Sequence, residues 1–153
     1  MRPPGIRKLT AGVVERSLEF GTLYATYLHD FGVPGECDAQ FRGLLSRLLR
    51  RGWIGGFYMA SRTEWLGFCI YSRTYSPVAR SPAYSLDDMF VSPSHRRQGV
   101  PSRLVLGLVE LARKQEAKRI YVNTDAGDGV LMRFYERNGF VDADANILML
   151  EVT

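Results

Sequence analysis

Residues 86–104, LDDMFVSPSHRRQGVPSRL, carry the most informative pattern of the sequence. This stretch combines an apolar strand pattern, a polar turn that contains two arginines and a glycine, and the start of a helix. A helix N-terminus offers N–H groups without intrahelical partners and a partial positive charge, which suits a phosphate. Gly99 allows a close backbone approach, and Pro101 fits the first helical turn, where a missing N–H costs least. Taken alone, such a turn is more often a plain solvated connection, so the rest of the sequence has to decide.

The hydrophobic spacing on both sides of this stretch predicts a mixed α/β domain around one sheet, with residues 1–153 as a single domain. Strands are predicted at 6–9, 53–60, 65–75, 84–91, 120–123, 140–141 and 147–152. Helices are predicted at 11–31, 38–51, 101–118 and 129–138. Residues 74–85, with two prolines and several serines, are predicted to be the longest loop.

The composition places the chain in a broad class. Hydrophobic residues make up 46% and charged residues 24%, the balance of a globular protein rather than a disordered one. No apolar run approaches the roughly 18 residues that a membrane span needs, and residues 1–5 carry no secretion signal. Cys37 and Cys69 are expected to be reduced thiols. We therefore expect a cytoplasmic protein without a membrane partner.

Several kinds of chemistry find no support in the sequence. The two histidines, His29 and His95, lie outside any Cys/His cluster, so no metal site is expected. Neither a G-x-S-x-G nucleophile elbow nor a G-K-[ST] phosphate loop occurs.

The charge is divided unevenly along the chain. Residues 91–119 carry seven Lys/Arg and two Asp/Glu, whereas residues 120–153 carry two Lys/Arg and six Asp/Glu. A basic segment beside an acidic one suggests a ligand with an anionic end and a cationic end. A chance distribution of surface charge is the alternative.

Residues 86–104 resemble the acetyl-CoA-binding motif of the GNAT superfamily of N-acetyltransferases. In that motif a hydrophobic strand ending in V-x-P is followed by [RQ]-x-x-G-x-[GA] and a long helix. Here VSP (91–93) and RRQGVP (96–101) match it, except that Pro101 replaces the final Gly or Ala. Downstream, RFYERNGF (133–140) resembles the family's second hallmark, F-Y-x-[KR]-x-G-[FA]. One helix and one strand separate the two motifs, as in the family, and the resemblance is clear over residues 65–152.

Within the superfamily, the chain looks most like the diamine (spermidine/spermine) acetyltransferase branch. GFCIY (67–71) with TYSP (74–77) resembles that branch's strand and loop, and LDDMFV (86–91) resembles its L-E-D-x-[FY]-V. Gly127-Asp128 stands where the branch has a W-N pair.

The resemblance implies a GNAT-like mixed sheet whose central parallel strands splay apart around acetyl-CoA, with helices on either side. Met89, Phe90 and Val91 would pair with the pantetheine as an added strand would. The backbone of the turn would hold the pyrophosphate, which makes the following residues candidates for cofactor binding: Arg96, Arg97, Gln98, Gly99, Val100, Pro101 and Ser102. Because Pro101 removes one N–H donor, Arg96 or Arg97 is expected to compensate.

The resemblance also implies catalytic roles. Asp87 matches the acidic residue that takes the amine's proton in the diamine branch, and Tyr135 matches the family's general acid for the departing sulfur. Strand alternation places Asp87 and Asp88 on opposite faces, so one of them is expected to face the cleft. Asp88 and Asn123 are candidates for substrate binding. The alternatives are local backbone caps for the two aspartates and Asn123, and core packing for Tyr135.

The sequence thus predicts acetyl transfer from acetyl-CoA to a primary amine of a small, polyamine-like or aminoalkyl molecule. An aminoglycoside or a protein amine remains open as acceptor, and a non-catalytic CoA-binding regulatory module is the alternative from another class. A nucleic-acid partner is not expected, because no recognised binding motif is present. Because dimers are common in the family that the chain resembles, we expect a homodimer.

Overall fold

The computed structural model describes residues 4–33, 38–125, 127–145 and 147–152. The chain divides into two compact units, residues 1–123 and residues 124–153, and each is described by itself. Among the described residues, none of the helices has the length and apolar character needed to cross a membrane.

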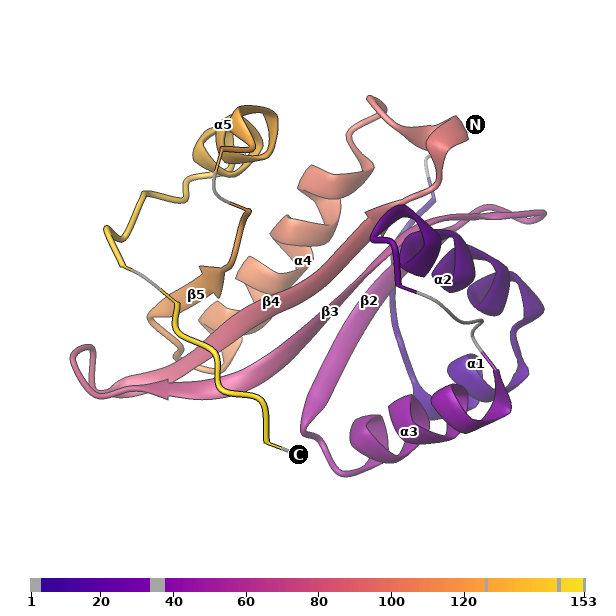
Figure 1. The fold of residues 1–153 in the computed structure, drawn as a ribbon, viewed down its shortest axis with the longest axis horizontal. Helices are drawn as coiled ribbons and strands as arrows, with labels where there is room; N and C mark the ends of the chain where they lie inside the picture. The colour runs from indigo at the N-terminus through magenta and orange to yellow at the C-terminus, as the bar shows by residue number, and fades with distance from the viewer. Residues whose placement is uncertain (1–3, 34–37, 126, 146, 153) are drawn as a thin grey trace. The chain divides into compact units, whose positions relative to one another are not determined.

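The first unit is built on a five-stranded sheet in the order β1-β2-β3-β4-β5, with helices on both faces (Figure 1). Its strands are β1 (Ile6–Lys8), β2 (Ile54–Ala60), β3 (Trp65–Ser76), β4 (Ser81–Val91) and β5 (Arg119–Val122). The first four pair antiparallel, whereas β4 and β5 run parallel. The mixed α/β architecture expected from the sequence is therefore confirmed.

One face of the sheet is covered by α1 (Ala11–Arg16), α2 (Leu18–Asp30) and α3 (Ala39–Arg50). The sequence predicted a single helix over 11–31, and this was wrong at Ser17. Ser17 is extended, with ψ 117°, and its hydroxyl accepts a bond of 3.1 Å from the Phe20 amide. It therefore ends one helix and caps the next, a role that suits serine. The core under these helices consists of Leu9, Val14, Phe20, Leu23, Tyr24, Tyr27, Leu45, Phe68, Ile70 and Phe90.

The other face is covered by α4 (Val100–Lys114), which follows a short 3-10 helix, η1 (Pro93–His95). The apolar stripe of α4 is buried, with Leu104 and Leu108 at most 1% exposed. A Cβ added at Gly107 of α4 would lie 3.7 Å from the Phe57 ring of β2, so the helix lies close to the sheet. Because α4 is held along its length, its N-terminus has a fixed place beside the end of β4.

A β-bulge interrupts the pairing of β4 with β3. Ile70 pairs with Asp88 and Tyr71 with Leu86, so Asp87 is the extra residue. Before the bulge, the Tyr84 ring lies 5.5 Å from Tyr71, on the α4 side of the sheet. After the bulge, Asp88 contacts α2. Positions 84 and 88 would share a face in a regular strand. The bulge therefore reverses the alternation, so that even-numbered side chains face α4 before it and α2 after it.

The predicted loop over 74–85 was wrong. Strand β3 continues to Ser76 and β4 begins at Ser81, so only residues 77–80 form the turn between them. Within the hairpin, Thr74 pairs with Ala83 and Tyr75 with Pro82. Long-range backbone pairing therefore overrides the local turn signal of the prolines and serines.

The second unit contains α5 (Gly129–Arg137), close to the helix predicted at 129–138. Asp128 caps it by accepting a 3.0 Å bond from the Leu131 amide. The strands predicted at 140–141 and 147–152 were wrong, because residues 140–145 and 147–152 are neither helix nor strand. Leu148 and Val152 are 95% and 92% exposed. An apolar run becomes a strand only when a neighbour supplies its backbone bonds, and these described residues have no such neighbour.

Candidate functional site

The centre of the candidate site is the point where β4 and β5 stop pairing. The parallel ladder runs from Ala83–Arg119 to Leu86–Val122. Strand β4 continues through Val91, so residues 87–91 face no strand on the β5 side within the described part of the chain. Two parallel strands that part in this way leave backbone N–H and C=O groups that an extended ligand can bind. Met89, Phe90 and Val91, the residues expected along the pantetheine, lie on this free segment.

After β4, the chain passes through η1 into the turn that opens α4. Arg97 and Gly99 both adopt the left-handed conformation, with φ of 62° and 75°. Gly99 is the N-cap of α4 and Pro101 lies in its first turn, as the sequence predicted. Among the described residues, the N–H groups of Gly99, Val100 and Ser102 find no hydrogen-bond acceptor. The first turn of α4 also lacks an acidic residue, so its positive end is not neutralised locally.

Gly67 of β3 lets the start of α4 approach the sheet closely. A Cβ at Gly67 would lie 2.8 Å from the Phe90 carbonyl oxygen and 3.2 Å from Val100 Cγ1. Val100 itself is 2% exposed. The absence of a side chain at one strand position therefore sets the distance between the end of β4 and the helix N-terminus.

The side chains of the turn have different surroundings. The Arg96 guanidinium forms an ion pair with Asp30 at the end of α2, at 3.2 Å, and lies over the Phe90 ring, 5.6 Å from its centroid. Gln98 donates to the Ser94 carbonyl at 3.2 Å. Arg97 is exposed, and no hydrogen bond to another described residue is found for its side chain. Arg97 is therefore the arginine with a guanidinium available to a ligand, whereas that of Arg96 is already paired.

Asp88 is the most tightly held acidic group of the site. It accepts hydrogen bonds from the hydroxyl groups of Tyr27 and Tyr24, the latter at 3.4 Å. Burial raises the pKa of Asp88, while the two tyrosine bonds act in the opposite direction and the nearby charge of Asp87 adds to the increase. Burial, with a smaller part from Asp88, raises the pKa of Tyr27 as well. Asp88 is thus a partly buried carboxyl group whose orientation is fixed by two tyrosine hydroxyl groups.

Asp87 and Asn123 have open surroundings. Asp87 is exposed and is the bulged residue of β4, so strict alternation does not hold there and cannot assign its face. Asn123 is exposed and directly follows β5, at the end where the two strands part. In the first unit, Asp87, Asp88 and Asn123 thus lie where β4 and β5 stop pairing, and β4 runs on from there toward the turn of residues 96–102.

Tyr135 belongs to α5 in the second unit and is 6% exposed. Its ring lies 5.0 Å from that of Phe134 and 5.3 Å from that of Phe140. Both ring contacts lie within the second unit.

Two sets of contacts have no motif behind them in the sequence. Tyr24 and Tyr27 could line the acceptor pocket, although a core or surface position is the first interpretation of their place in the sequence. The structure buries both and bonds their hydroxyl groups to Asp88. Asp30, the partner of Arg96, is 66 residues away in the chain. No local sequence signal connects residues so far apart.

Groups of three or more His, Cys, Asp or Glu side chains with metal-binding geometry do not occur among the described residues. Cys69 is a free, buried cysteine, and burial raises the pKa of its thiol to about 12. Cys37, the other expected thiol, lies outside the described residues.

Comparison with known proteins agrees with this geometry. The family model described as "Acetyltransferase (GNAT) family" matches residues 21–140, most of the chain. The chain is 31% identical over 77 residues to an uncharacterized N-acetyltransferase, YhfO, of Bacillus subtilis (strain 168). This alignment covers 50% of the chain and 52% of that relative, so the chain spans about half the length of the relative it matches.

Solved structures share the fold over nearly the whole chain. A probable acetyltransferase is 25% identical, with a TM-score of 0.84 and coverage of 100% of this chain and 99% of its own. An aminoglycoside acetyltransferase from an uncultured soil metagenomic sample is 17% identical, with a TM-score of 0.76 and coverage of 97% and 94%. The second likeness concerns the fold alone. With its splayed parallel strands, its glycine-capped helix and this family match, the protein belongs to the GNAT family of acetyltransferases.

Proposed function

We propose that this enzyme transfers the acetyl group of acetyl-CoA to a primary amine of a small molecule of the polyamine or aminoalkyl kind. The observation that carries the proposal is a continuous path along β4 into α4. The segment 87–91, which has no strand partner on the β5 side among the described residues, leads through η1 to a helix N-terminus with free amides. An extended thioester with a diphosphate at one end fits such a path.

The pantetheine arm is proposed to lie along residues 89–91 and to bond to their free backbone groups, as an added strand does. The pyrophosphate is proposed to bind the N–H groups of Gly99, Val100 and Ser102. Pro101 supplies no N–H, and we assign the compensating charge to Arg97, because the guanidinium of Arg96 is held by Asp30. GNAT enzymes generally use acetyl-CoA, which supports this assignment.

The acceptor amine is proposed to bind near Asp87, Asp88 and Asn123. A free alkylamine has a pKa of about 10.4 and is mostly protonated at neutral pH. In the proposed reaction Asp87 takes this proton, directly or through water. Its exposed position on the bulge allows both the amine and a water molecule to reach it. Asp88, held by Tyr24 and Tyr27, attracts the cationic substrate.

The chemical step follows from the deprotonated amine. Its nitrogen attacks the thioester carbonyl carbon, a C–N bond forms and the C–S bond breaks. The electron pair leaves with sulfur as a thiolate, which takes a proton from the Tyr135 phenol in the proposed mechanism. The nitrogen releases its extra proton to solvent, and the Tyr135 phenolate regains a proton from solvent. A phenol has a pKa of about 10, close enough to that of an alkyl thiol for efficient transfer. The role of Tyr135 rests on its sequence motif, FYERNGF, at residues 134–140.

A second acceptor class has a specific observation behind it. An aminoglycoside acetyltransferase shares the fold at a TM-score of 0.76, and aminoglycosides are also cationic amines that two carboxylates can attract. The polyamine-like acceptor is preferred because residues 86–91 follow the diamine-branch pattern. A non-catalytic CoA-binding module is the remaining alternative.

A release assay for CoA separates these possibilities. Purified protein with acetyl-CoA is tested against diamines, polyamines, aminoglycosides, amino acids and peptides, with calorimetry of acetyl-CoA alone in parallel. We expect binding in calorimetry and the highest kcat/KM with a diamine or polyamine. Binding without turnover on any amine would indicate the non-catalytic module, and absence of binding would reject the proposal.

Assembly and location stay predictions from the sequence. A homodimer is expected, and size-exclusion chromatography with light scattering measures it directly. A cytoplasmic location is expected as well, and fractionation of the source cells with an antibody against the chain tests it.

A further inference from the structure

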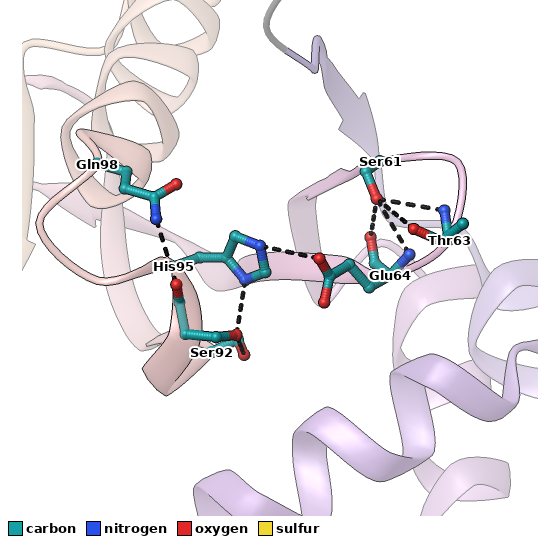
Figure 2. Close-up of polar contacts among 7 residues, drawn as sticks. Ser61, Thr63, Glu64, Ser92, His95 and Gln98 are labelled. Atoms are coloured by element: carbon teal, nitrogen blue, oxygen red, sulfur yellow. Dashed lines mark hydrogen bonds and ion pairs between the residues drawn. The ribbon is translucent and has the colours of Figure 1, made fainter.

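The turn between β2 and β3 is fixed by one serine. Ser61 Oγ accepts from the amides of Thr63 and Glu64 at 3.2 and 3.1 Å. The Ser61 amide donates to the Glu64 carbonyl at 2.8 Å and closes the turn. Figure 2 shows these bonds converging on Ser61. These bonds therefore fix the backbone position of Glu64, although its side chain is 55% exposed.

His95 connects this turn to the start of the phosphate-binding segment. Its Nε2 lies 3.1 Å from Glu64 Oε1, and its Nδ1 lies 3.0 Å from Ser94 Oγ. Its side chain is only 15% exposed. The His95 ring lies between Glu64 on one side and Ser92 on the other (Figure 2). Both ring nitrogens therefore have partners, and the orientation of the ring is determined.

These bonds do not depend on one protonation state. In the neutral ring, Nε2–H donates to the carboxylate while the Ser94 hydroxyl donates to Nδ1. In the charged ring, both nitrogens donate and the hydroxyl accepts. The geometry of the contact between Glu64 and His95 thus fits either form of the ring.

The bonds continue from His95 through the turn. Ser92 Oγ and Ser94 Oγ are 3.0 Å apart, and the His95 amide donates to the Ser92 carbonyl at 2.8 Å. Gln98 then reaches back to the Ser94 carbonyl at 3.2 Å. A continuous set of contacts therefore runs from the β2–β3 turn to the residue before Gly99.

The segment that these contacts hold is strained. Arg97 has a φ of 62°, a left-handed conformation that costs a residue with a Cβ about 1 kcal/mol. Such a conformation persists when neighbouring contacts determine it from several sides. The Arg96–Asp30 pair restrains the turn from α2, and the Glu64–His95 pair restrains it from the β2–β3 turn.

We propose that Glu64 and His95 are positioning residues for the phosphate-binding turn, residues 96–102, and hold its free amides in the orientation that binds acetyl-CoA. This inference rests on the proposed function for its ligand. Neither residue is assigned a contact with acetyl-CoA or with the amine, and Glu64 lies outside the sequence motif. The pair acts through the turn, so it should affect acetyl-CoA binding more than the chemical step.

The test compares Glu64→Gln and His95→Phe with the wild type. Glu64→Gln keeps the shape and removes the charge at an exposed position, so it is expected to fold, whereas His95→Phe keeps a planar ring and removes both nitrogens. Glu110→Gln is the matched control, because Glu110 is exposed on α4 and no ion pair is found for it among the described residues. Calorimetry with acetyl-CoA, steady-state kinetics and amide hydrogen exchange of the ligand-free turn are measured for each.

We expect the Kd and KM for acetyl-CoA to rise about threefold to tenfold in both variants, with kcat within about twofold of the wild type. The double variant should lose no more affinity for acetyl-CoA than the more affected single variant, since the two residues form one contact. Exchange at residues 96–100 should accelerate in both variants and not in Glu110→Gln.

Unchanged Kd and unchanged exchange in both variants would overturn the proposal, and so would equal effects in Glu110→Gln. A wild type that binds no acetyl-CoA would reject the proposed function and, with it, the ligand assigned to the turn. In that case hydrogen exchange of the free protein still decides whether the pair holds the turn. The two failures are therefore distinguishable.

Discussion

Gly99→Ala tests the proposed phosphate site most directly. Gly99 has a φ of 75°, and a Cβ placed on it meets no atom within 4 Å. The substitution therefore adds a methyl group without a clash, and its cost in the free protein is the left-handed backbone alone, about 1 kcal/mol. For a chain of this length, that cost lowers the melting temperature by roughly 2–4 °C. The folded population at 25 °C is expected to stay close to that of the wild type.

Gly52→Ala is the matched control. Gly52 follows α3, has a φ of 69°, and also has nothing within 4 Å of an added Cβ. The two variants should lose the same stability in urea unfolding. Only Gly99→Ala should weaken acetyl-CoA binding, at least about tenfold in calorimetry, which is about 1.4 kcal/mol. The reason is that the methyl group and any change in φ both affect the free amides of the turn.

Equal affinities for acetyl-CoA in Gly99→Ala, Gly52→Ala and the wild type would contradict the proposed phosphate site. The amides of Gly99, Val100 and Ser102 would then not be the pyrophosphate site. A parallel loss of affinity in both variants would point to a general effect of stability instead.

Three further predictions concern the chemistry of the site. Tyr135→Phe keeps the ring and removes the proposed proton donor, so kcat should fall about a hundredfold with acetyl-CoA affinity retained; unchanged turnover would remove Tyr135 from the mechanism. Asp87→Asn should shift the pH–rate profile upward, because the amine must then lose its proton to solvent, and a profile identical to wild type would exclude the proton-acceptor role. Burial raises the pKa of Asp88, so stability from this group is greatest below the usual value of 3.8 and is lost as pH rises through the raised value. Asp88→Asn removes that loss, and its unfolding free energy relative to wild type should therefore increase from about pH 3 to pH 7; a pH-independent difference would contradict the assignment.

The strand–turn–helix centre of the fold could be predicted from the sequence because its signals are local. Gly99 and Pro101 mark the start of α4 through their own backbone preferences. Asp128 is likewise a cap that can be identified from its residue type. The apolar stripe of α4 needs only the spacing of Leu104 and Leu108.

Contacts between distant residues could not be predicted in the same way. Asp88 and Tyr27 are 61 residues apart, and Arg96 and Asp30 are 66 residues apart. The bulge at Asp87 is a property of the pairing between β3 and β4, and β4 by itself carries no sign of it. Alternation therefore cannot assign the face of Asp87, the position at which the sequence used it to separate Asp87 from Asp88.

At the C-terminal residues, the sequence predicted a strand that the structure does not contain among the described residues. Ile147, Leu148 and Val152 have the side chains of a strand, and the prediction followed that preference. Strand formation also needs a partner backbone, which is a tertiary property. The side chains remain 65%, 95% and 92% exposed.

The bulge in β4 decides which side chains of its second half are buried. If Asp87 were instead paired with Ile70, every later residue would shift by one position, turning the Asp88 carboxylate toward the apolar layer under α4 and the Phe90 ring out of the core. Deleting Asp87 would leave Asp88 opposite Ile70 and keep both faces, whereas deleting a residue between 88 and 91 would reverse the faces of those that follow it. Natural variation in chain length should therefore be found at position 87 and at the hairpin tip, residues 77–80, and be excluded from residues 88–91.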